Sequence, residues 1–194
     1  MKISIARFSA VLALAVFAFL LFGGSVQKAS ADDSADTLAG KYCTDNGGVV
    51  ETRYPYFGTN FANPLQLAGV RHFCQFTARD DSRIHVLLST LYATKPTLAA
   101  LAYYAKIPLQ SSGGGGNPAS FYCTQLGGSD QFGGTNIGGG GWVQWGAIDE
   151  SLEACIFPDM SSIDSWGLAY HSASIIRGIN LGRVLRYHIH ERRK

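Results

Sequence analysis

The sequence lacks the short motifs that mark several common enzyme classes. It contains no G-x-S-x-G nucleophile elbow, no H-E-x-x-H zinc helix and no phosphate loop. The glycine-rich stretch at 113–116 is not followed by the Lys-Ser or Lys-Thr pair that a phosphate loop requires. These absences argue against serine-hydrolase, metalloprotease and nucleotide-binding functions. We therefore predict a protein without catalytic residues, a cofactor or a bound metal.

The sequence has little that could span a membrane. The apolar run at 11–22 has 12 residues, whereas a spanning helix needs about 20. Lys2 and Arg7 precede this run, and the small-x-small stretch Ala29-Ser30-Ala31 follows it, which is the form of a secretory signal peptide. We therefore predict a signal peptide at residues 1–31, no transmembrane helix after its cleavage, and export to the periplasm or the exterior.

The chain also lacks an excess of either charge once the predicted signal is removed. Removal takes away Lys2, Arg7 and Lys28 but no acidic residue, so the net charge changes from +2 to −1. This balance gives no electrostatic basis for binding nucleic acid or an anionic membrane surface. The basic residues near the end of the chain, which we interpret as a solvated terminus, are Arg183, Arg186, Arg192, Arg193 and Lys194.

Cysteine is scarce, and its spacing is informative. The chain has four cysteines, with no C-x-x-C pair that would favour a zinc site. An even number of cysteines in an exported chain predicts disulfide bonds, and four cysteines allow three pairings. Each half of the chain carries a cysteine shortly before a Gly-Gly pair and a second cysteine about thirty residues later. This repeat favours the pairs Cys43–Cys74 and Cys123–Cys155.

The repeat also predicts the domain organisation. We expect an α+β protein of two tandem small disulfide-stapled modules, each with a short helix against an antiparallel sheet. The first module spans 38–108 and the second spans 117–190. Between them, a linker at 109–116 contains the run SSGGGG, which has no side chain that could stabilise an ordered conformation.

Local patterns predict the elements within each module. Asn117 is a good N-cap with Pro118 at the first helical position, so we expect a helix that ends at Gly127-Gly128. A second helix, with proline in its first turn, is expected at 96–106, and 32–39 is expected to be a flexible lead-in. Predicted strands lie at 49–54, 70–77, 84–91, 142–145, 154–157, 163–170 and 183–190, with 142–145 paired to 154–157.

The second module resembles a known bacterial family over residues 117–171. The matching segments are NPASFYCTQLGG at 117–128, CIFPD at 155–159 and WGLAY at 166–170. The family is a small domain of unknown function in secreted proteins and lipoproteins that are often labelled haemolysins. Two positions depart from its pattern, since Met160 replaces a glycine and Ile163 stands where the family has a further cysteine. The resemblance implies no chemical activity, and the first module retains only a weaker copy of the pattern.

Aromatic and acidic side chains supply candidates for a binding surface. Trp142 and Trp145 are the main aromatic candidates, although buried packing is the expected role of most aromatic side chains. Trp142 is the best candidate for exposure because glycines surround it. The acidic cluster of Asp149, Glu150 and Glu153 is interpreted as a solvated loop. A glycosidase would instead need two carboxylates held at a set separation in a cleft.

Two further patterns suggest alternative functions. His188 and His190 lie on one face of the predicted C-terminal strand and could hold Zn²⁺ or Cu²⁺ together with His85 or His171. We interpret them instead as part of an exposed polar face. The predicted exposed loop from Asp159 to Ser162 could enter the active site of a protease.

From these features we predict an exported, non-catalytic binding or interaction protein of the bacterial envelope or exterior. Its partner would be an unidentified protein or envelope component. The alternatives are a proteinase-inhibitor-like module, a hydrolase of an envelope polymer, and a metal-binding protein.

Overall fold

The structure is a computed structural model that describes residues 31–110, 116–130 and 137–188, with side chains from Thr37 onward. The predicted signal peptide, most of the predicted linker and His190 lie outside these residues. Asp33–Lys194 form one compact unit. In the described part of the chain, no helix is both long enough and apolar enough to cross a bilayer.

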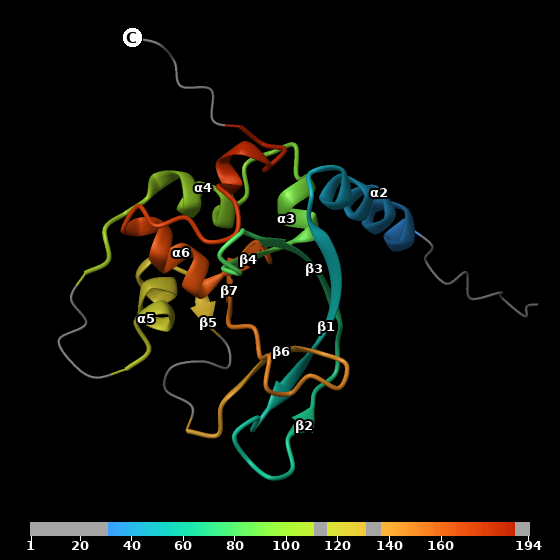
Figure 1. Ribbon diagram of the computed structural model, residues 1–194, viewed down its shortest axis with the longest axis vertical. Helices are drawn as coiled ribbons and strands as arrows, with labels where there is room; N and C mark the ends of the chain where they lie inside the picture. The colour runs from blue at the N-terminus through green and yellow to red at the C-terminus, as the bar shows by residue number, and fades with distance from the viewer. Residues whose placement is uncertain (1–30, 111–115, 131–136, 189–194) are drawn as a thin grey trace, which may run out of the picture. The chain divides into compact units, whose positions relative to one another are not determined.

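A curled antiparallel sheet organises this unit (Figure 1). Its path is β2-β1-β3-β4-β8-β7-β5, and β6 pairs with β1 outside this path. The strands are β1 (Val49–Phe57), β2 (Leu65–Gln66), β3 (Arg71–Thr77), β4 (Arg83–Leu87), β5 (Ser129–Asp130), β6 (Gly140–Gln144), β7 (Ala154–Ile156) and β8 (Ser162–Asp164). The expected α+β class is confirmed, and strands from both halves of the chain belong to one sheet.

Short helices accompany the strands. They are α2 (Ala31–Asp45), α3 (Leu88–Tyr92), α4 (Leu98–Ala105), α5 (Pro118–Gln125) and α6 (Ser165–Ser172), with a 3₁₀ turn η1 (Leu181–Arg183). The predicted N-cap is present: the Asn117 side chain accepts hydrogen bonds from the amides of Ala119 and Ser120 at the start of α5. Thr97 likewise accepts from the Ala100 amide at the start of α4. Such caps satisfy amides that the helix itself leaves without partners.

Both predicted disulfides are present, with Cα–Cα distances of 5.8 Å for Cys43–Cys74 and 5.5 Å for Cys123–Cys155. All four cysteines are fully buried. On the chain-entropy model, each loop of this size contributes about 3–4 kcal/mol to stability. Two disulfides fit a protein that folds outside the reducing cytoplasm.

The two disulfides have closely matched surroundings. In each half, the first glycine of the pair has a φ near +80°, at Gly47 and Gly127. The second glycine donates its amide to the carbonyl of the half's first cysteine, over 2.9 Å in both cases. The following strand then pairs with the strand of the second cysteine in the same register, Val50 opposite Cys74 and Asp130 opposite Cys155.

The matched halves meet in the middle of the sheet. β3 continues into β4, with Cys74 opposite Val86, and β7 continues into β8, with Cys155 opposite Ile163. Val86 and Ile163 are in turn opposite each other where β4 pairs with β8. The two halves therefore share backbone hydrogen bonds at equivalent strands.

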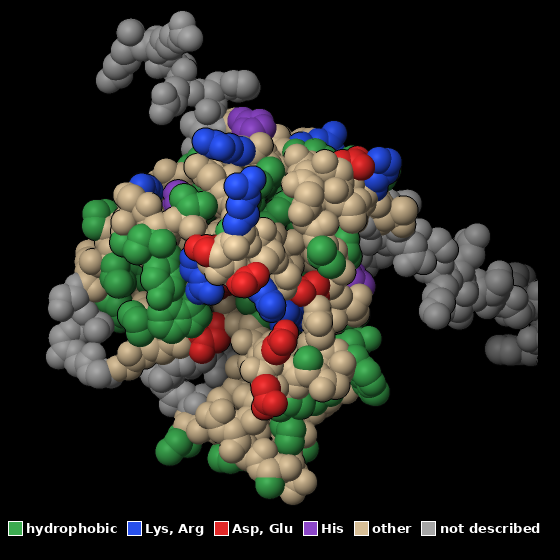
Figure 2. Space-filling model, in the orientation of Figure 1, with side chains coloured by type: hydrophobic (Ala, Val, Ile, Leu, Met, Phe, Trp, Pro, Cys, Tyr) green, Lys and Arg blue, Asp and Glu red, His purple; other side chains and the backbone are tan. Residues whose placement is uncertain are grey.

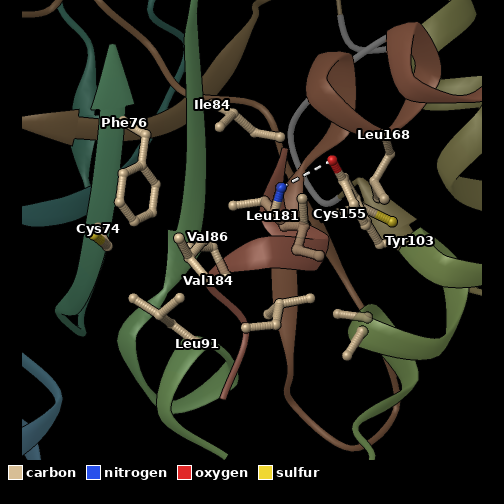
Figure 3. Close-up of a cluster of buried hydrophobic side chains, with 14 of the residues drawn as sticks. Cys74, Phe76, Ile84, Val86, Leu91, Tyr103, Cys155, Leu168, Leu181 and Val184 are labelled. Atoms are coloured by element: carbon tan, nitrogen blue, oxygen red, sulfur yellow. Dashed lines mark hydrogen bonds between the residues drawn. The ribbon is translucent and has the colours of Figure 1, made fainter. Parts of the chain in front are cut away.

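One main hydrophobic core lies against the sheet face that carries the cysteines. Phe76, Ile84 and Val86 project from β3 and β4 toward Leu168 of α6 and Leu181 of η1 (Figure 3). The Leu181 amide donates a hydrogen bond to the Tyr103 hydroxyl over 3.0 Å. Burial raises the pKa of this hydroxyl to about 12. The core therefore combines residues from both halves of the chain.

Three predictions about local structure were wrong. The expected strand at 163–170 is mostly helix α6, because the Asp164 side chain accepts a hydrogen bond from the Gly167 amide and caps a helix there. The expected strand at 84–91 ends at Leu87, where α3 begins. The expected flexible lead-in at 32–39 belongs to α2, whose residue Ala39 is buried in the core.

Two further expectations about strands and their pairing were wrong. The segment at 183–190 is no strand in its described part: Leu181–Arg183 form η1, and Leu185 is buried by packing rather than by sheet alternation. The expected partner strands at 142–145 and 154–157 do not pair with each other. β6 instead pairs with β1, and β7 pairs with β5 and β8.

Candidate functional site

A cleft with a volume of about 310 Å³ opens on the sheet face opposite the main core. Figure 2 shows acidic and basic side chains gathered in the middle of the visible surface. The cleft is lined by Arg53, Arg83, His85, Glu150, Ser151, Leu152, Glu153, Asp164, Trp166 and Arg177. Its volume lies at the lower end of the range for small-molecule sites, roughly 300–1,000 Å³.

Arg53 of β1 forms the base of the cleft and is almost completely buried. Its Nε donates to Glu51 Oε2 over 2.7 Å, and its Nη1 donates to the carbonyls of Trp142 and Glu150 over 2.8 and 3.0 Å. Glu51 and Arg53 lie on the same face of β1 because they are two residues apart on a strand. The guanidinium thus connects β1 to β6 and to the segment that follows it.

His85 of β4 lies beside this ion pair and is also buried. Its Nε2 lies 3.3 Å from Glu51 Oε2 and 3.1 Å from Gln75 Oε1. On its other side, Nδ1 lies 3.5 Å from Asp164 Oδ2. Since Asp164 is on β8, His85 and Asp164 form an ionic contact across the junction of the two halves.

Burial and ionic partners act in opposite directions on these groups. Burial works to lower the pKa of His85, but Asp164 and Glu51 outweigh it, so the pKa is raised above its ordinary value. Burial works to raise the pKa of Glu51, but the contacts with His85 and Arg53 outweigh it, so this pKa is lowered. The ionic contacts at the base of the cleft therefore favour the charged forms of His85 and Glu51 despite their burial.

Glu153 behaves differently from the network at the base. Burial raises the pKa of its carboxyl; the hydrogen bond from Asn117 opposes this shift, and the nearby charges of Asp130 and Asp164 add to it. The Asn117 Nδ2–Glu153 Oε2 distance is 2.6 Å. The prediction of a solvated acidic loop is correct for the exposed Asp149 and Glu150 but wrong for Glu153, which is half-buried on the cleft wall.

Two arginines place positive charge at the opening of the cleft. Arg83 is about half exposed, and its Nη1 lies 3.7 Å from Glu150 Oε2, which is a long and solvated ion pair. Arg177 lies over the Tyr170 ring, with its guanidinium carbon 5.2 Å from the ring centre. Both guanidinium groups line the cleft and can donate further hydrogen bonds to a ligand.

The predicted aromatic candidates have different environments. Trp142 is only 6% exposed and packs against Phe73, with Arg71 over its ring, so the prediction that it is exposed was wrong. The missing Cβ of the flanking Gly141 leaves space for Ser151 and Leu152, which pack against this part of β6. Trp145 is 77% exposed and contacts the Tyr54 ring edge-on.

The candidate loop from Asp159 to Ser162 is exposed only in part. Asp159 is exposed, and its carboxylate accepts hydrogen bonds from the amides of Leu98 and Ser161. Burial works to raise the pKa of Asp159, but a hydrogen bond from the Ser161 hydroxyl and those from the two amides outweigh it, so the pKa lies below its ordinary value. Ser161 and Ser162 are buried. Asp159 therefore anchors the start of α4 to this turn.

The histidines proposed as metal ligands are dispersed. His85 is in the cleft, whereas the His171 ring stacks on Tyr103 with ring centres 3.8 Å apart. His188 is exposed near the end of the described chain, and His190 lies outside it. Among the described residues, no group of three or more His, Cys, Asp or Glu side chains is arranged to hold a metal ion.

Sequence reasoning missed Arg53 and Asp164, and it considered His85 only as a possible metal ligand. One signal was available at β1: Glu51 and Arg53 alternate with Val50 and Thr52, so the two charged residues lie on the same face of the strand. The burial of this face depends on the distant segment at 142–152, which no local pattern connects to it.

The fold and cleft define a class of protein: an α+β domain with two buried disulfides and a small, strongly polar cleft on the sheet face away from its core. No family model, curated protein or solved structure matches the chain. The resemblance to the secreted bacterial domain therefore stays a prediction.

Proposed function

We propose that the chain is an exported binding protein of the bacterial envelope or exterior, and that its cleft binds a small polar ligand carrying an acidic group. The observation that carries this proposal is the pairing of a buried ionic base with two arginines at the opening. Buried charges cost desolvation free energy and are a weak source of stability. A network that holds Arg53, His85 and Asp164 beneath a cleft is better explained by the binding surface it maintains.

The arginines indicate the ligand's charge. Arg83 and Arg177 come from β4 and from the segment after α6, and both face the cleft. Guanidinium groups suit carboxylates because they offer paired N–H donors in a planar arrangement. Glu153, whose pKa is raised by burial, also lines the cleft and carries less negative charge toward an acidic ligand than an ordinary carboxylate would.

Thermal unfolding with defined probes tests this proposal. N-acetylmuramic acid, an envelope sugar with a carboxylate, should raise the melting temperature, and uncharged N-acetylglucosamine should raise it less. Arg83→Gln and Arg177→Gln should each reduce the shift, whereas Lys41→Gln, on the exposed face of α2, should not. Equal shifts with both sugars, or equal loss in all three variants, would rule out recognition of the acidic group in this cleft.

A second candidate function, hydrolysis of an envelope polymer, is favoured by Glu153. A carboxyl with a raised pKa in a cleft is suited to act as a general acid. Glu153 would donate its proton to the leaving glycosidic oxygen. Asp164 would accept a proton from the water that attacks the sugar carbon. Release of reducing ends from a purified envelope polymer, lost in Glu153→Gln but kept in Glu150→Gln, would establish this activity.

We also infer that the two halves are copies of one tandem unit. The matched helix, Gly-Gly pair, disulfide and strand register of each half support this inference. The cleft uses the two copies differently. Arg53 and His85 come from the first half, while Glu153, Asp164 and Arg177 come from the second.

A further inference from the structure

A second surface, separate from the cleft, is distinguished by a complete lack of charge. Residues 54–70 and 137–146 contain no Asp, Glu, Lys or Arg. They form the end of β1, the short strand β2, strand β6 and the adjoining turns, which we call the charge-free tip. In Figure 2 the lowest part of the surface, over β2 and the turn that joins it to β1, shows only hydrophobic and uncharged side chains.

Backbone hydrogen bonds join the separate segments of the charge-free tip. Phe57 pairs with Leu65 between β1 and β2. The Gly58 amide donates to the Gly139 carbonyl over 3.0 Å, and the Asn60 amide donates to the Gly138 carbonyl over 2.9 Å. The turn at 58–61 and the turn before β6 therefore lie side by side, and their apolar side chains share one end of the unit.

The apolar side chains of the charge-free tip are exposed. Ile137 is 91% exposed, Leu65 is 61% exposed and Phe61 is 53% exposed. Phe57, Leu67 and Trp145 are also exposed. A group of this kind on one charge-free surface differs from the single apolar side chains that normally occur on a protein surface.

We propose that the charge-free tip inserts into the interfacial region of a lipid bilayer. Side chains that enter this region must be apolar or aromatic and free of charge, because charged groups are costly near hydrocarbon. The tip meets this condition over its whole described length. Trp145 and the neighbouring Tyr54 have the amphipathic rings that are enriched at the membrane–water interface.

The shape of the charge-free tip favours a lipid surface over a folded partner. Its exposed apolar side chains project from turns, from the end of β1 and from the two-residue strand β2. β2 is too short to extend the sheet into a second chain, and Pro64 precedes it without a backbone donor. A fluid bilayer needs no such complementary template.

Vesicle flotation tests the proposal. The chain without its first 31 residues, which retains the compact unit, should bind neutral phosphatidylcholine vesicles with little dependence on salt. Leu65→Asp and Ile137→Asp should each weaken partitioning about tenfold or more, because a carboxylate replaces an inserted apolar side chain. Two controls should bind normally: Val49→Asp, at the opposite end of β1, and Ile175→Asp, after α6, both of which replace exposed apolar residues.

Other outcomes would overturn the proposal. These include no binding to vesicles, equal weakening in the control variants, and binding that requires phosphatidylglycerol and is lost at high salt. Sedimentation of the same chain without vesicles distinguishes a second copy as the occupant. Concentration-dependent dimers abolished by Leu65→Asp, together with no flotation, would assign the charge-free tip to self-association. Circular dichroism melting of each variant excludes unfolding as the cause of a loss.

Discussion

Arg53 shows how one side chain can support a whole surface. Its guanidinium binds Glu51 and two carbonyls that belong to a segment about ninety residues away. The side chain is almost completely buried, so water has little access to these contacts. The cleft therefore depends on this residue even though Arg53 belongs to the base rather than to the opening.

Arg53→Met should destabilise the fold strongly. The substitution keeps most of the side-chain volume but leaves Glu51 and two carbonyls without their donor. Removing one partner from a buried ion pair typically costs about 3–5 kcal/mol. Urea unfolding should show this loss, whereas Arg83→Met, at the exposed ion pair with Glu150, should cost about 1 kcal/mol or less. Similar costs for the two variants would contradict the role assigned to Arg53.

The buried ionic network also predicts how stability depends on pH. The pKa of His85 is raised, so its contribution is complete below its ordinary pKa of 6.5 and is lost as pH rises through the folded value. The pKa of Glu51 is lowered, so its contribution is complete above 4.5 and is lost as pH falls through the folded value. The network should stabilise the fold most between these two values.

Urea unfolding from this pH range upward into the alkaline range provides the measurement. His85→Gln should show a smaller loss of stability above neutral pH than the wild type. Glu153 also loses its contribution to stability as pH rises, because its pKa is raised in the folded state. This loss occurs in the wild type and in His85→Gln alike. The difference between them therefore isolates His85. An unchanged alkaline slope in His85→Gln would contradict the ionic contact with Asp164.

At the scale of elements, the helix–glycine–strand unit around each disulfide was the most predictable part of the fold. Cysteine spacing and the Gly-Gly pairs indicated the two disulfides, and Asn117-Pro118 indicated the start of α5. These signals lie within a few residues of the elements they specify. The second glycine has a role beyond ending a helix, because its missing side chain leaves space for the sulfur atoms.

Gly48→Ala and Gly128→Ala test this close packing. A Cβ at Gly48 would overlap Cys74 Sγ, and a Cβ at Gly128 would overlap Cys155 Sγ. Each substitution should cost about 1–3 kcal/mol through overpacking. Gly116→Ala, where a Cβ would meet no atom within 4 Å, should leave the unfolding free energy nearly unchanged. Equal effects at Gly48 and Gly116 would show that the disulfide can move away.

Elements after the second disulfide were predicted poorly, for identifiable reasons. Ile163 to Tyr170 has the apolar content of a strand, but Asp164 caps the chain into α6. The alternation at 183–190 suggested a half-buried strand, yet Val184 and Leu185 are buried against the main core through η1. In both places, tertiary packing and one local cap override the pattern of alternating residues.

At the scale of the whole molecule, the arrangement of the sheet was the least predictable feature. β1 pairs with β6 across some ninety residues, and β4 pairs with β8 through Val86 and Ile163. The cleft exists because these pairings bring Arg53, His85 and Asp164 together. Local sequence patterns do not show which strands pair when they are far apart in the sequence. The α+β class was therefore predictable from the sequence, whereas the cleft was not.

The shared sheet predicts that neither half is stable alone. Residues 32–110 would lose β6 as a partner of β1 and β8 as a partner of β4. Residues 116–194 would lose β1 as the partner of β6, β4 as a partner of β8, and part of the core. Each fragment should therefore lack cooperative thermal unfolding by circular dichroism, and mixing the two should restore it at least in part. Two fragments that melt cooperatively by themselves would instead establish two independent tandem modules.

The complete burial of all four cysteines has a kinetic consequence. A small thiol cannot reach either sulfur pair while the core is closed, so reduction must wait for an opening of the surrounding structure. Disulfides formed in an oxidising compartment therefore persist after the chain has folded. A molecule carried into reducing surroundings would keep its shape for as long as that opening is rare.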